Sequence, residues 1–540
     1  MTAALACAQA VIGQLLAQGV TDLVLAPGSR SAPLALVADA AAREGLLRLH
    51  VRVDERVAGF LALGLAKASG RCVPVVTTSG TAVGNLLPAV MEAHHSGVPL
   101  LVISADRPAA LVGAGANQTT DQTVVLSGFL RQLARLSSVA PAASWPAQVA
   151  RGVLAAEGLL SRRPGPAQLN IELSEPLVAG EGPVAAPATL QAVRAGSLGA
   201  PEAEALAGTP PTVVICGDAG ARTGHAAVRL AEAAGLPLVA EPTSNARHGA
   251  NALATGRLLL AGDLGARVQR VIVFGRPNLS RPVTALLSRP GVEVVVVTDT
   301  PDYVDPGWRA SLITGAVSVE PGPPEWLAAW RQADAARLAD VTSLLAAAPE
   351  PTGPALARLV VGTVGEGQVL CLGNSNPIRD ADLAPVGQWV VPVFGNRGLS
   401  GIDGTISTAI GVALATGAPT TLLCGDLSFF HDAGALAIGP GEPRPALRVV
   451  VADDGGGSIF ATLEYGQPRF AEAFERVFAT PTGLDPSAVA AGYGVRSRSV
   501  TTLAGVAAVL AEPIAGLEVL VVRIDRSGRP NQARRIASGA

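Results

Sequence analysis

The feature that most constrains this chain is a repeated alternation between two kinds of apolar segment. Short runs rich in Val, Ile and Leu, such as those at 212–218 and 447–454, alternate with longer Ala- and Leu-rich segments of helical periodicity. Short runs that are apolar throughout are typical of strands buried on both faces. The alternation therefore predicts parallel β-sheets with helices on both faces, the doubly wound α/β architecture.

The predicted strands fall into three groups, which indicates three doubly wound domains. The chain has 540 residues, more than one hydrophobic core usually serves. An Ala-, Gly- and Pro-rich stretch at 179–201 follows the first group, and a helical, Pro-flanked connector at 320–355 follows the second. We expect domains at 1–180, 181–345 and 346–540. The expected strands lie within 22–27, 48–55, 74–79, 99–105 and 167–173, then 212–218, 236–241, 270–275 and 292–299, then 368–374, 388–395, 420–427, 447–454 and 517–525.

Composition argues against several classes of protein. A formal net charge of −3 and only 3% aromatic residues do not fit a nucleic-acid-binding protein. The stretch 72–91 carries no charge, but prolines and glycines interrupt it, so we interpret it as a strand, a turn and a helix start rather than a membrane span. The five cysteines are scattered without a CxxC motif, and the N-terminus lacks a basic signal-peptide segment. We therefore expect a cytoplasmic protein with reduced thiols.

Two predicted strands of the last domain end in acidic residues. Asp426 ends one strand, and Asp453 and Asp454 end another, just before three glycines. Ligands of doubly wound sheets bind at the carboxyl ends of the strands, where acids can share a Mg²⁺ ion and glycines let the backbone approach a phosphate. Either motif alone would be ordinary turn chemistry. The pair favours a magnesium–diphosphate site, and no Walker A or GxGxxG motif offers another phosphate site.

This acidic pair, combined with an acid in the first domain, resembles the thiamin-diphosphate-dependent enzymes. In that family the metal is held by the Asp of a GD motif, an Asn or Asp 27 positions later and a backbone carbonyl two residues further on; here these are Asp426, Asp453 and Gly455. A register shifted by one residue would make Asp454 the ligand. The resemblance is closest to one branch, the synthases of menaquinone biosynthesis, and covers nearly the whole chain. It rests on the segments APGSRSAPL, HVRVDERVAGFLALGLAK, TTSGTAVGNLLPAVMEA, ISADRP, GANQTTDQ, GNSNPIRD, GNRGLSGIDGTIST and GDLSFFHD.

The resemblance implies thiamin diphosphate as cofactor, with Mg²⁺ or Mn²⁺. Glu55 fits the catalytic acid that contacts N1′ of the aminopyrimidine and supports proton transfer there. From composition alone, Glu55 would more simply form a structural salt bridge with Arg52 or Arg56. Ile402 fits the bulky apolar residue that holds the cofactor bent, although an isolated Ile is more often a core residue. The implied cofactor-binding residues are Glu55, Ser79, Ile402, Asp426, Leu427, Ser428 and Asp453.

The same branch joins 2-oxoglutarate to isochorismate, so the resemblance implies a transferase that decarboxylates the first and adds the resulting carbanion to the second in a 1,4 sense. Both substrates are dicarboxylates, which require cationic partners. Every cation except Lys67 is an arginine, so any single arginine could also be an ordinary surface charge. The implied substrate-binding residues are Arg30, Arg107, Asn117, Gln118, Ser375, Arg379, Arg397 and Arg281, with Arg276 as a second arginine of the middle domain, Gln118 also catalytic, and Ser29 and Thr81 on matching loops.

The family also indicates what to expect of the histidines and of assembly. We interpret His94 and His95 as residues of a helix face and His431 as the mark of a helix start, not as catalytic groups. Active sites of the family lie between subunits, which implies a homodimer or homotetramer. Two alternatives remain open: an acetohydroxyacid-synthase-like decarboxylase or carboligase, and a non-catalytic cofactor-binding protein on the same scaffold.

Overall fold

In the computed structural model, all pairings between the described named strands are parallel, as the sequence predicts. The structure describes residues 1–178, 182–196, 199, 201–347, 350–383 and 386–538. The chain divides into two units, each described by itself. The first comprises Met1–Leu198, Gly398–Gly417 and His431–Pro445, and the second comprises Gly199–Arg397, Ala418–Phe430 and Ala446–Ala540.

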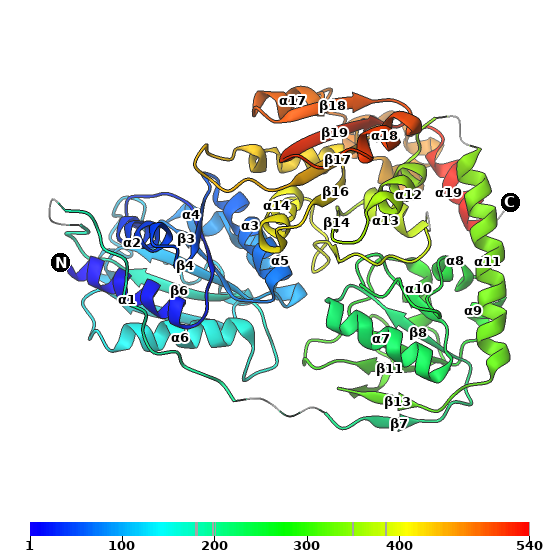
Figure 1. Ribbon diagram of the computed structural model, residues 1–540, viewed down its shortest axis with the longest axis horizontal. Coiled ribbons are helices and arrows are strands. Elements are labelled where there is room, and N and C mark those ends of the chain that lie inside the picture. Colours follow the sequence, from blue (N-terminus) through cyan, green and yellow to red (C-terminus); the bar gives the residue numbers. More distant parts are fainter. Residues whose placement is uncertain (179–181, 197–198, 200, 348–349, 384–385, 539–540) are drawn as a thin grey trace. The chain divides into compact units, whose positions relative to one another are not determined.

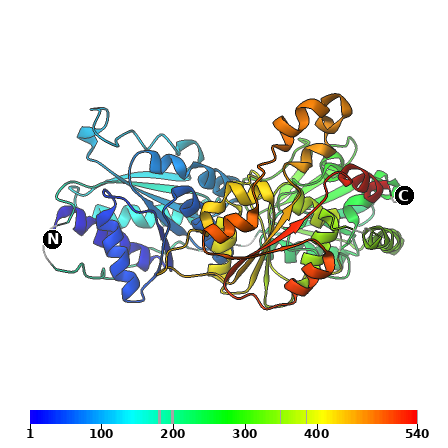
Figure 2. The same ribbon diagram turned by 90° about the horizontal axis from the view of Figure 1, so that it is seen from above.

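The first unit contains a six-stranded sheet in the order β2-β1-β3-β4-β6-β5. Helices α1, α2 and α6 pack on one face, and α3 and α5 cover the other, so the sheet is doubly wound (Figures 1 and 2). The strands are β1 Asp22–Leu25, β2 Arg48–Val51, β3 Val73–Thr77, β4 Leu100–Asp106, β5 Gln132–Ser137 and β6 Ala167–Glu172. The helices are α1 Ala3–Ala17, α2 Ala32–Arg43, α3 Glu55–Ser69, α4 Thr81–Asn85, α5 Leu87–Ser96, α6 Ser144–Glu157 and α14 Thr405–Thr416.

Local sequence fixes where helix α3 begins and ends. Asp54 is its N-cap: one carboxylate oxygen accepts the backbone N–H of Arg56 at 2.8 Å and of Val57 at 3.3 Å. Gly70 ends the helix with a φ of +67°, a left-handed conformation that glycine adopts without strain. Glu55 is thereby held in the first turn of the helix.

Helices α3 and α14 pack tightly because glycines line their contact. A side chain at Gly64 would meet the backbone oxygen of Thr408 at 2.2 Å, and one at Gly404 would meet the ring of Phe60 at 1.9 Å. Both distances are far below van der Waals contact, so no side chain fits at either position. The close approach places the loop before α14 beside the helix that carries Glu55.

The second unit contains two larger parallel sheets and one short pair. The sheet orders are β12-β11-β10-β8-β9, β15-β14-β16-β17-β19-β18 and β13-β7. The strands are β7 Glu204–Leu206, β8 Thr212–Cys216, β9 Leu238–Ala240, β10 Arg270–Phe274, β11 Glu293–Val297, β12 Ala310–Thr314, β13 Val317–Val319, β14 Val369–Leu372, β15 Val393–Phe394, β16 Thr420–Gly425, β17 Leu447–Asp453, β18 Arg496–Val500 and β19 Leu517–Arg523. The helices are α7 Ala221–Ala234, α8 Gly256–Leu259, α9 Asp263–Ala266, α10 Arg281–Leu287, α11 Pro324–Ala346, α12 Gly353–Thr363, α13 Asn376–Leu383, α15 Asp426–His431, α16 Ala471–Ala473, α17 Pro486–Gly492, α18 Leu503–Leu510 and α19 Arg529–Ser538.

The strands that the sequence does not predict include one at an edge of each large sheet: β5, β12 and β18. Exposed and half-buried positions interrupt all three: β5 alternates, and neither β12 nor β18 contains a buried residue, so these strands lack the continuous apolar run of a central strand. The expected strand at 388–395 forms only as β15, because Pro392 interrupts it and the preceding Val390 is exposed. Edge strands are thus the main error of the sequence-based prediction.

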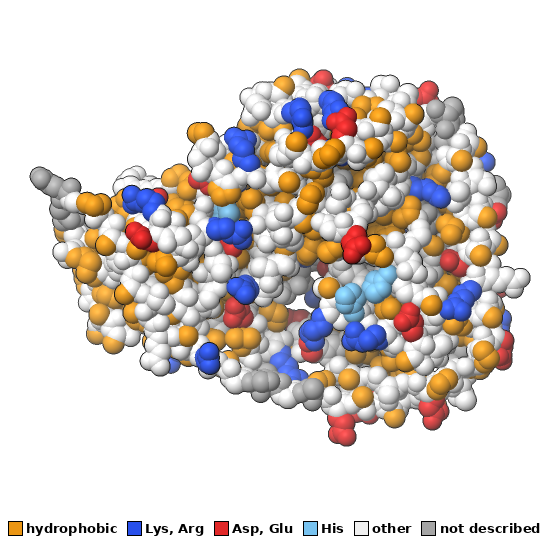
Figure 3. All heavy atoms as spheres, in the orientation of Figure 1, with side chains coloured by type: hydrophobic (Ala, Val, Ile, Leu, Met, Phe, Trp, Pro, Cys, Tyr) orange, Lys and Arg blue, Asp and Glu red, His pale blue; other side chains and the backbone are white. Residues whose placement is uncertain are grey.

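Other sequence-based expectations concern domain boundaries, membranes and thiols. The boundary expected between 180 and 181 lies outside the described residues, and the one between 345 and 346 falls in the last turn of α11; both stay predictions. Among the described residues, no helix combines the length and the apolar character of a membrane span. All five cysteines are buried free thiols. The face drawn in Figure 3 carries acidic and basic side chains interspersed rather than a patch of one sign.

Candidate active site

The two acidic strand ends lie side by side in the second unit. Strands β16 and β17 are neighbours, with Gly425 opposite Ala452, so Asp426 and the Asp453–Asp454 pair follow at the same edge of the sheet. Burial raises the pKa of Asp426 to about 7, and the nearby charges of Asp454 and Asp453 raise it further. Burial also raises the pKa of Asp454 to about 6, against the hydrogen bond that its carboxylate accepts from Ser458. Crowded carboxylates of this kind are stabilised by a bound cation.

The candidate ligands of the two metal registers differ in their contacts. Asp453 Oδ2 forms an ion pair with Arg523 Nη1 at 2.8 Å, and the carbonyl of Gly455 accepts a hydrogen bond from Arg526 Nη1 at 3.1 Å. Within the described residues, Asp454 forms no such ion pair; its carboxylate accepts the Ser458 hydroxyl, and its charge raises the pKa of Asp426 more than that of any other acid. In the part of the chain that the structure describes, neither Asp426 nor Asp454 forms an ion pair with an arginine, whereas Asp453 does.

The number of protein ligands at this edge is small. Within the described residues, no group of three or more His, Cys, Asp or Glu side chains could hold a metal ion. Two carboxylates are nevertheless what Mg²⁺ uses when a phosphate and water complete its octahedron. Leu427 donates its backbone N–H to Asp426 Oδ1 at 2.8 Å, and Ser428 is buried in the same first turn of α15. This donor set fits a magnesium–diphosphate group.

Glu55 of the first unit is half-buried at the start of α3. Its Oε2 accepts a hydrogen bond from Asn85 Nδ2 at 3.2 Å. The two neighbouring arginines contact other groups: Arg52 lies 3.4 Å from a Glu442 oxygen, and Arg56 donates to the backbone oxygen of His431 at 2.8 Å. The structural salt bridge that composition suggests for Glu55 is therefore replaced by a hydrogen bond with a neutral partner.

Ile402 lies half-buried in the loop 398–404 of the same unit, just before α14. Its backbone oxygen accepts a hydrogen bond from the Thr405 hydroxyl at 3.3 Å. The loop ends at Gly404, against the ring of Phe60 on α3. An apolar side chain is thus held in a short loop whose end packs on the helix of Glu55.

Three predicted residues of the first unit form one cluster. The Arg107 guanidinium donates from Nη1 to Ser79 Oγ at 2.6 Å and to the backbone oxygen of Gln118 at 2.9 Å. The Gln118 side chain donates from Nε2 to the Ser79 carbonyl at 3.0 Å, and Gln118 has a φ of +55°. Asn117, next in the loop, is exposed. Arg30 is bound elsewhere, to the Leu173 carbonyl at 2.9 Å and to Glu175 at 3.1 Å.

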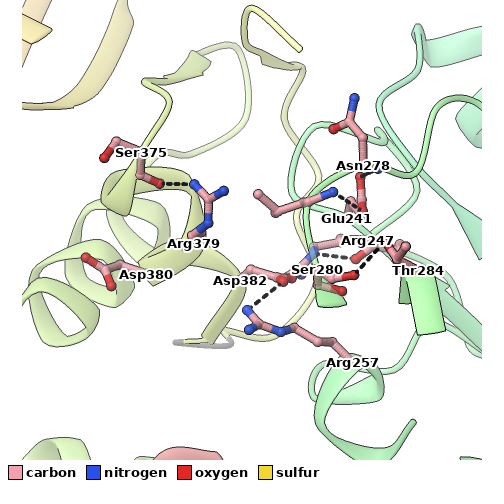
Figure 4. A network of polar contacts seen from close by, with 12 residues as sticks. Glu241, Arg247, Arg257, Asn278, Ser280, Thr284, Ser375, Arg379, Asp380 and Asp382 are labelled. Atoms are coloured by element: carbon pink, nitrogen blue, oxygen red, sulfur yellow. Dashed lines mark hydrogen bonds and ion pairs between the residues drawn. The ribbon is translucent and has the colours of Figure 1, made fainter. Parts of the chain in front are cut away.

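Of the predicted arginines of the second unit, Arg379 is drawn in Figure 4, among a larger set of polar contacts. Arg379 donates to the Ser375 carbonyl at 2.8 Å, and burial together with the nearby positive charge of Arg397 lowers the pKa of Arg379. Arg397 is 2% exposed and donates to Asn374 Oδ1 at 2.8 Å and to Asn278 Oδ1 at 2.5 Å. A buried cation, Arg397, and a half-buried one, Arg379, therefore lie close together.

A cavity of about 450 Å³ opens beside this network, between residues of α8, α10, α13 and α19. Its wall combines apolar side chains with four arginines, namely Arg257, Arg281, Arg379 and Arg529. Arg281 is 80% exposed and lies 4.0 Å from Glu464, so its side chain is the least constrained of the four. A cavity with this lining suits a ligand that is apolar in part and carries carboxylates.

Sequence reasoning missed the residues that hold the network together. Glu241, which is 4% exposed, accepts the backbone N–H of Leu279 at 2.9 Å and of Asn278 at 3.3 Å. Asp382 is paired with Arg247 and, at 3.0 Å, with Arg257. Glu241 could have been found from the sequence, because it is an acid that directly follows a predicted strand, β9. Nothing comparable marked Asp382, whose position within α13 reads as an ordinary helical residue.

Comparison with known proteins identifies the family. Residues 5–125 match the family model described as the thiamine pyrophosphate enzyme, N-terminal TPP binding domain. A 2-succinyl-5-enolpyruvyl-6-hydroxy-3-cyclohexene-1-carboxylate synthase of Kineococcus radiotolerans is 48% identical over 561 residues, which cover 100% of this chain and 99% of that protein. Synthases of the same name from Nocardioides sp. and Paenarthrobacter aurescens are 46% and 45% identical, with 99% and 96% of this chain covered and 97% and 94% of those proteins. The chain therefore belongs to the 2-succinyl-5-enolpyruvyl-6-hydroxy-3-cyclohexene-1-carboxylate synthases, thiamin-diphosphate-dependent transferases of menaquinone biosynthesis, as its motifs predict.

Proposed function

We propose that this chain decarboxylates 2-oxoglutarate and adds the resulting carbanion to isochorismate in a 1,4 sense, which yields the product named in its relatives. The observation that carries the proposal is the near-complete coverage of relatives that share this one name, at 45–48% identity. The local chemistry supports it: Glu55 contacts a neutral amide, Asp426 lies near the charge of Asp454, and Arg379 lies near Arg397.

Thiamin diphosphate would supply, when bound, a nucleophilic carbon and a place for the electron pair left by CO₂. Glu55 would hold a proton against N1′ of the aminopyrimidine, and Ile402 would support the bent form of the cofactor. Asp426 and Asp454 would hold Mg²⁺, or Mn²⁺ in its place, while Leu427 and Ser428 would face the diphosphate. Asp453 and Gly455, the ligands of the unshifted register, remain a prediction, but their arginine contacts support the shifted one.

The arginines would bind the substrate carboxylates. Arg107 is oriented by its contacts with Ser79 and Gln118, so its guanidinium is held in place before a substrate arrives. Arg379 and Arg397 would form a second cationic group, and like-charge proximity makes an anion there more favourable. The remaining proposed contacts are Arg30, Asn117, Gln118, Ser375 and Arg281.

We also propose that the protein is a cytoplasmic homodimer or homotetramer. Five buried free thiols support a reducing compartment. Size-exclusion chromatography with light scattering would distinguish a dimer from a tetramer, and a monomer that retains full activity would contradict the assembly.

The test of the reaction is a single incubation with thiamin diphosphate, Mg²⁺, 2-oxoglutarate and isochorismate, in which the loss of isochorismate is followed. Replacing 2-oxoglutarate by pyruvate tests the acetohydroxyacid-synthase-like alternative, which would consume pyruvate and leave isochorismate unchanged. A protein that binds the cofactor but consumes neither 2-oxo acid would instead be the non-catalytic alternative. Consumption of isochorismate only when 2-oxoglutarate is present is the result expected.

A further inference from the structure

The loop 398–404, which carries Ile402, is held by a buried carboxylate on each side. At its start, Glu92 of α5 accepts the backbone N–H of Gly398 at 2.7 Å and of Leu399 at 2.8 Å, one on each carboxylate oxygen. Beyond its end, Asp432 accepts the backbone N–H of Ser407 at 2.7 Å and the hydroxyl of the same residue at 2.8 Å. Glu92 is 3% exposed and Asp432 is fully buried.

The need for Asp432 follows from the packing of the loop. Helix α14 has Gly404 as its N-cap, a residue with no side chain to accept the first backbone N–H groups. A side chain cannot be placed there, because a Cβ atom would lie 1.9 Å from the ring of Phe60. The close packing of α14 on α3 therefore removes the usual cap, and an acid from another segment supplies it.

The same segment is also tied to the helix of Glu55. Arg56, the neighbour of Glu55, donates to the backbone oxygen of His431 at 2.8 Å and lies 3.2 Å from its Nδ1. His431 directly precedes Asp432 in the chain. A short route of contacts thus runs from the first turn of α3 through residues 431–432 to the first turn of α14. Glu92 adds a second anchor from α5, which packs on α3.

We propose that Glu92 and Asp432 are positioning residues that fix the loop 398–404 and thereby set where Ile402 stands. Each acid accepts two hydrogen bonds, one on each carboxyl oxygen, and an amide has only one acceptor oxygen, so replacing either acid by its amide loosens one side of the loop. This rests on the proposed function, in which Ile402 supports the cofactor. Neither acid touches the cofactor or a substrate in this proposal; both act through the loop.

The first test measures the loop without cofactor or substrate. Amide hydrogen exchange is followed by mass spectrometry in the ligand-free protein and in the variants Glu92→Gln and Asp432→Asn. We expect about tenfold faster exchange of Gly398 and Leu399 in the first variant and of Ser407 in the second, because the amide loses one of the two acceptor oxygens. Unchanged exchange in both variants would overturn the proposal.

Matched variants separate positioning from general loosening. Asp334→Asn removes a carboxylate that likewise accepts a backbone N–H and a hydroxyl, both from Thr255 at 2.6 Å, but far along the chain from the loop. It should leave exchange at 398–407 unchanged. Ser407→Ala removes only the hydroxyl donor and keeps the backbone contact, so it serves if Asp432→Asn folds poorly. In Ser407→Ala, the backbone amide of residue 407 should exchange faster than in the unmodified protein, but by a smaller factor than in Asp432→Asn.

The second test asks whether the loop sets the cofactor. The near-ultraviolet circular dichroism of bound thiamin diphosphate should change in Glu92→Gln and Asp432→Asn, and kcat should fall about tenfold while KM for 2-oxoglutarate stays within about twofold. Faster exchange with an unchanged dichroism signal and kcat would overturn the positioning role. If the unmodified protein consumes no isochorismate, the proposed function fails, and exchange and dichroism still decide this proposal.

Discussion

The carboxylate of Asp453 and the guanidinium of Arg523 form an ion pair across two neighbouring parallel strands, with 2.8 Å between Oδ2 and Nη1. The two residues are direct partners in the register of β17 and β19. Asp454, one position later, leaves the strand and contributes its charge to the environment of Asp426 instead. Two adjacent residues therefore differ in their surroundings: Asp453 forms an ion pair with an arginine, whereas the charge of Asp454 acts on another acid, Asp426.

The variants Asp454→Asn and Asp453→Asn should differ in their need for metal. We expect Asp454→Asn, like Asp426→Asn, to raise the Mg²⁺ concentration for half-maximal cofactor binding by about tenfold or more, since an anionic ligand is lost. Asp453→Asn should change it by less than about threefold, because it removes the partner of a half-exposed arginine. Titration of Mg²⁺ at fixed thiamin diphosphate, followed by tryptophan fluorescence, measures this, and the reverse order of effects would restore the unshifted register.

Replacement of Glu55 by Gln should abolish turnover while leaving the fold intact. The amide can still meet the Asn85 side chain, but it cannot hold a proton against N1′ as a carboxyl does. We expect kcat to fall by about 10²-fold or more, with an unchanged far-ultraviolet dichroism spectrum. Glu157→Gln is the matched control, because Glu157 accepts a backbone N–H from Cys72 in the same unit and has no proposed role. Near-normal turnover of Glu55→Gln would contradict the assignment.

The cluster of Ser79, Arg107 and Gln118 should control substrate affinity. Arg107→Lys keeps the charge but loses the planar guanidinium, which can bind a carboxylate through two parallel N–H groups while Nη1 contacts Ser79 and Gln118. We expect KM for one of the two dicarboxylates to rise about tenfold to a hundredfold, which corresponds to about 1.4–2.8 kcal/mol. Arg135→Lys, at an exposed arginine paired with Asp121, serves as the control and should leave KM unchanged. Equal KM values for Arg107→Lys and the unmodified protein would remove Arg107 from the site.

Glu241 should make the stability of the second unit depend on pH. Burial raises its pKa from 4.5 to about 7, helped by the charge of Asp382 and opposed by Arg397 and two backbone donors. Because the folded state then binds a proton that the unfolded state releases, the stabilising contribution is present below pH 4.5 and is lost as the pH rises through about 7. The loss is at most about 3 kcal/mol.

Denaturant unfolding at pH 5 and pH 8 tests this expectation. The unfolding midpoint of the unmodified protein should fall between the two values by more than that of Glu241→Gln, whose amide does not titrate. Glu293→Gln removes an acid that forms an ion pair with Arg270 in the same unit. Its unfolding midpoint should change between pH 5 and pH 8 as much as that of the unmodified protein. If the unfolding midpoint changed equally between pH 5 and pH 8 in all three proteins, Glu241 would have an ordinary pKa in the folded protein.

The sequence by itself determined the central strands, the α/β class and the family. These follow from short-range patterns: an apolar run such as that of β17 is buried wherever it lies, and the GD and DDG motifs depend only on neighbours in the chain. The edge strands β5, β12 and β18 escaped this reasoning because a half-exposed strand has a weaker apolar signal. The cap at Asp54 also depends only on residues two and three positions later, although the sequence analysis predicted no cap there.

Only the tertiary structure decided which charged groups meet. Asp453 and Asp454 are adjacent and chemically identical in the sequence. The strand register nevertheless places Arg523 beside Asp453, whereas Asp454 follows in the turn, where its charge raises the pKa of Asp426. Glu92 and Asp432 likewise acquire their partners from segments far away in the chain, 306 and 25 positions distant. Electrostatic and hydrogen-bond energies depend on distances of a few ångströms, which folding sets through side-chain packing and which no local pattern encodes.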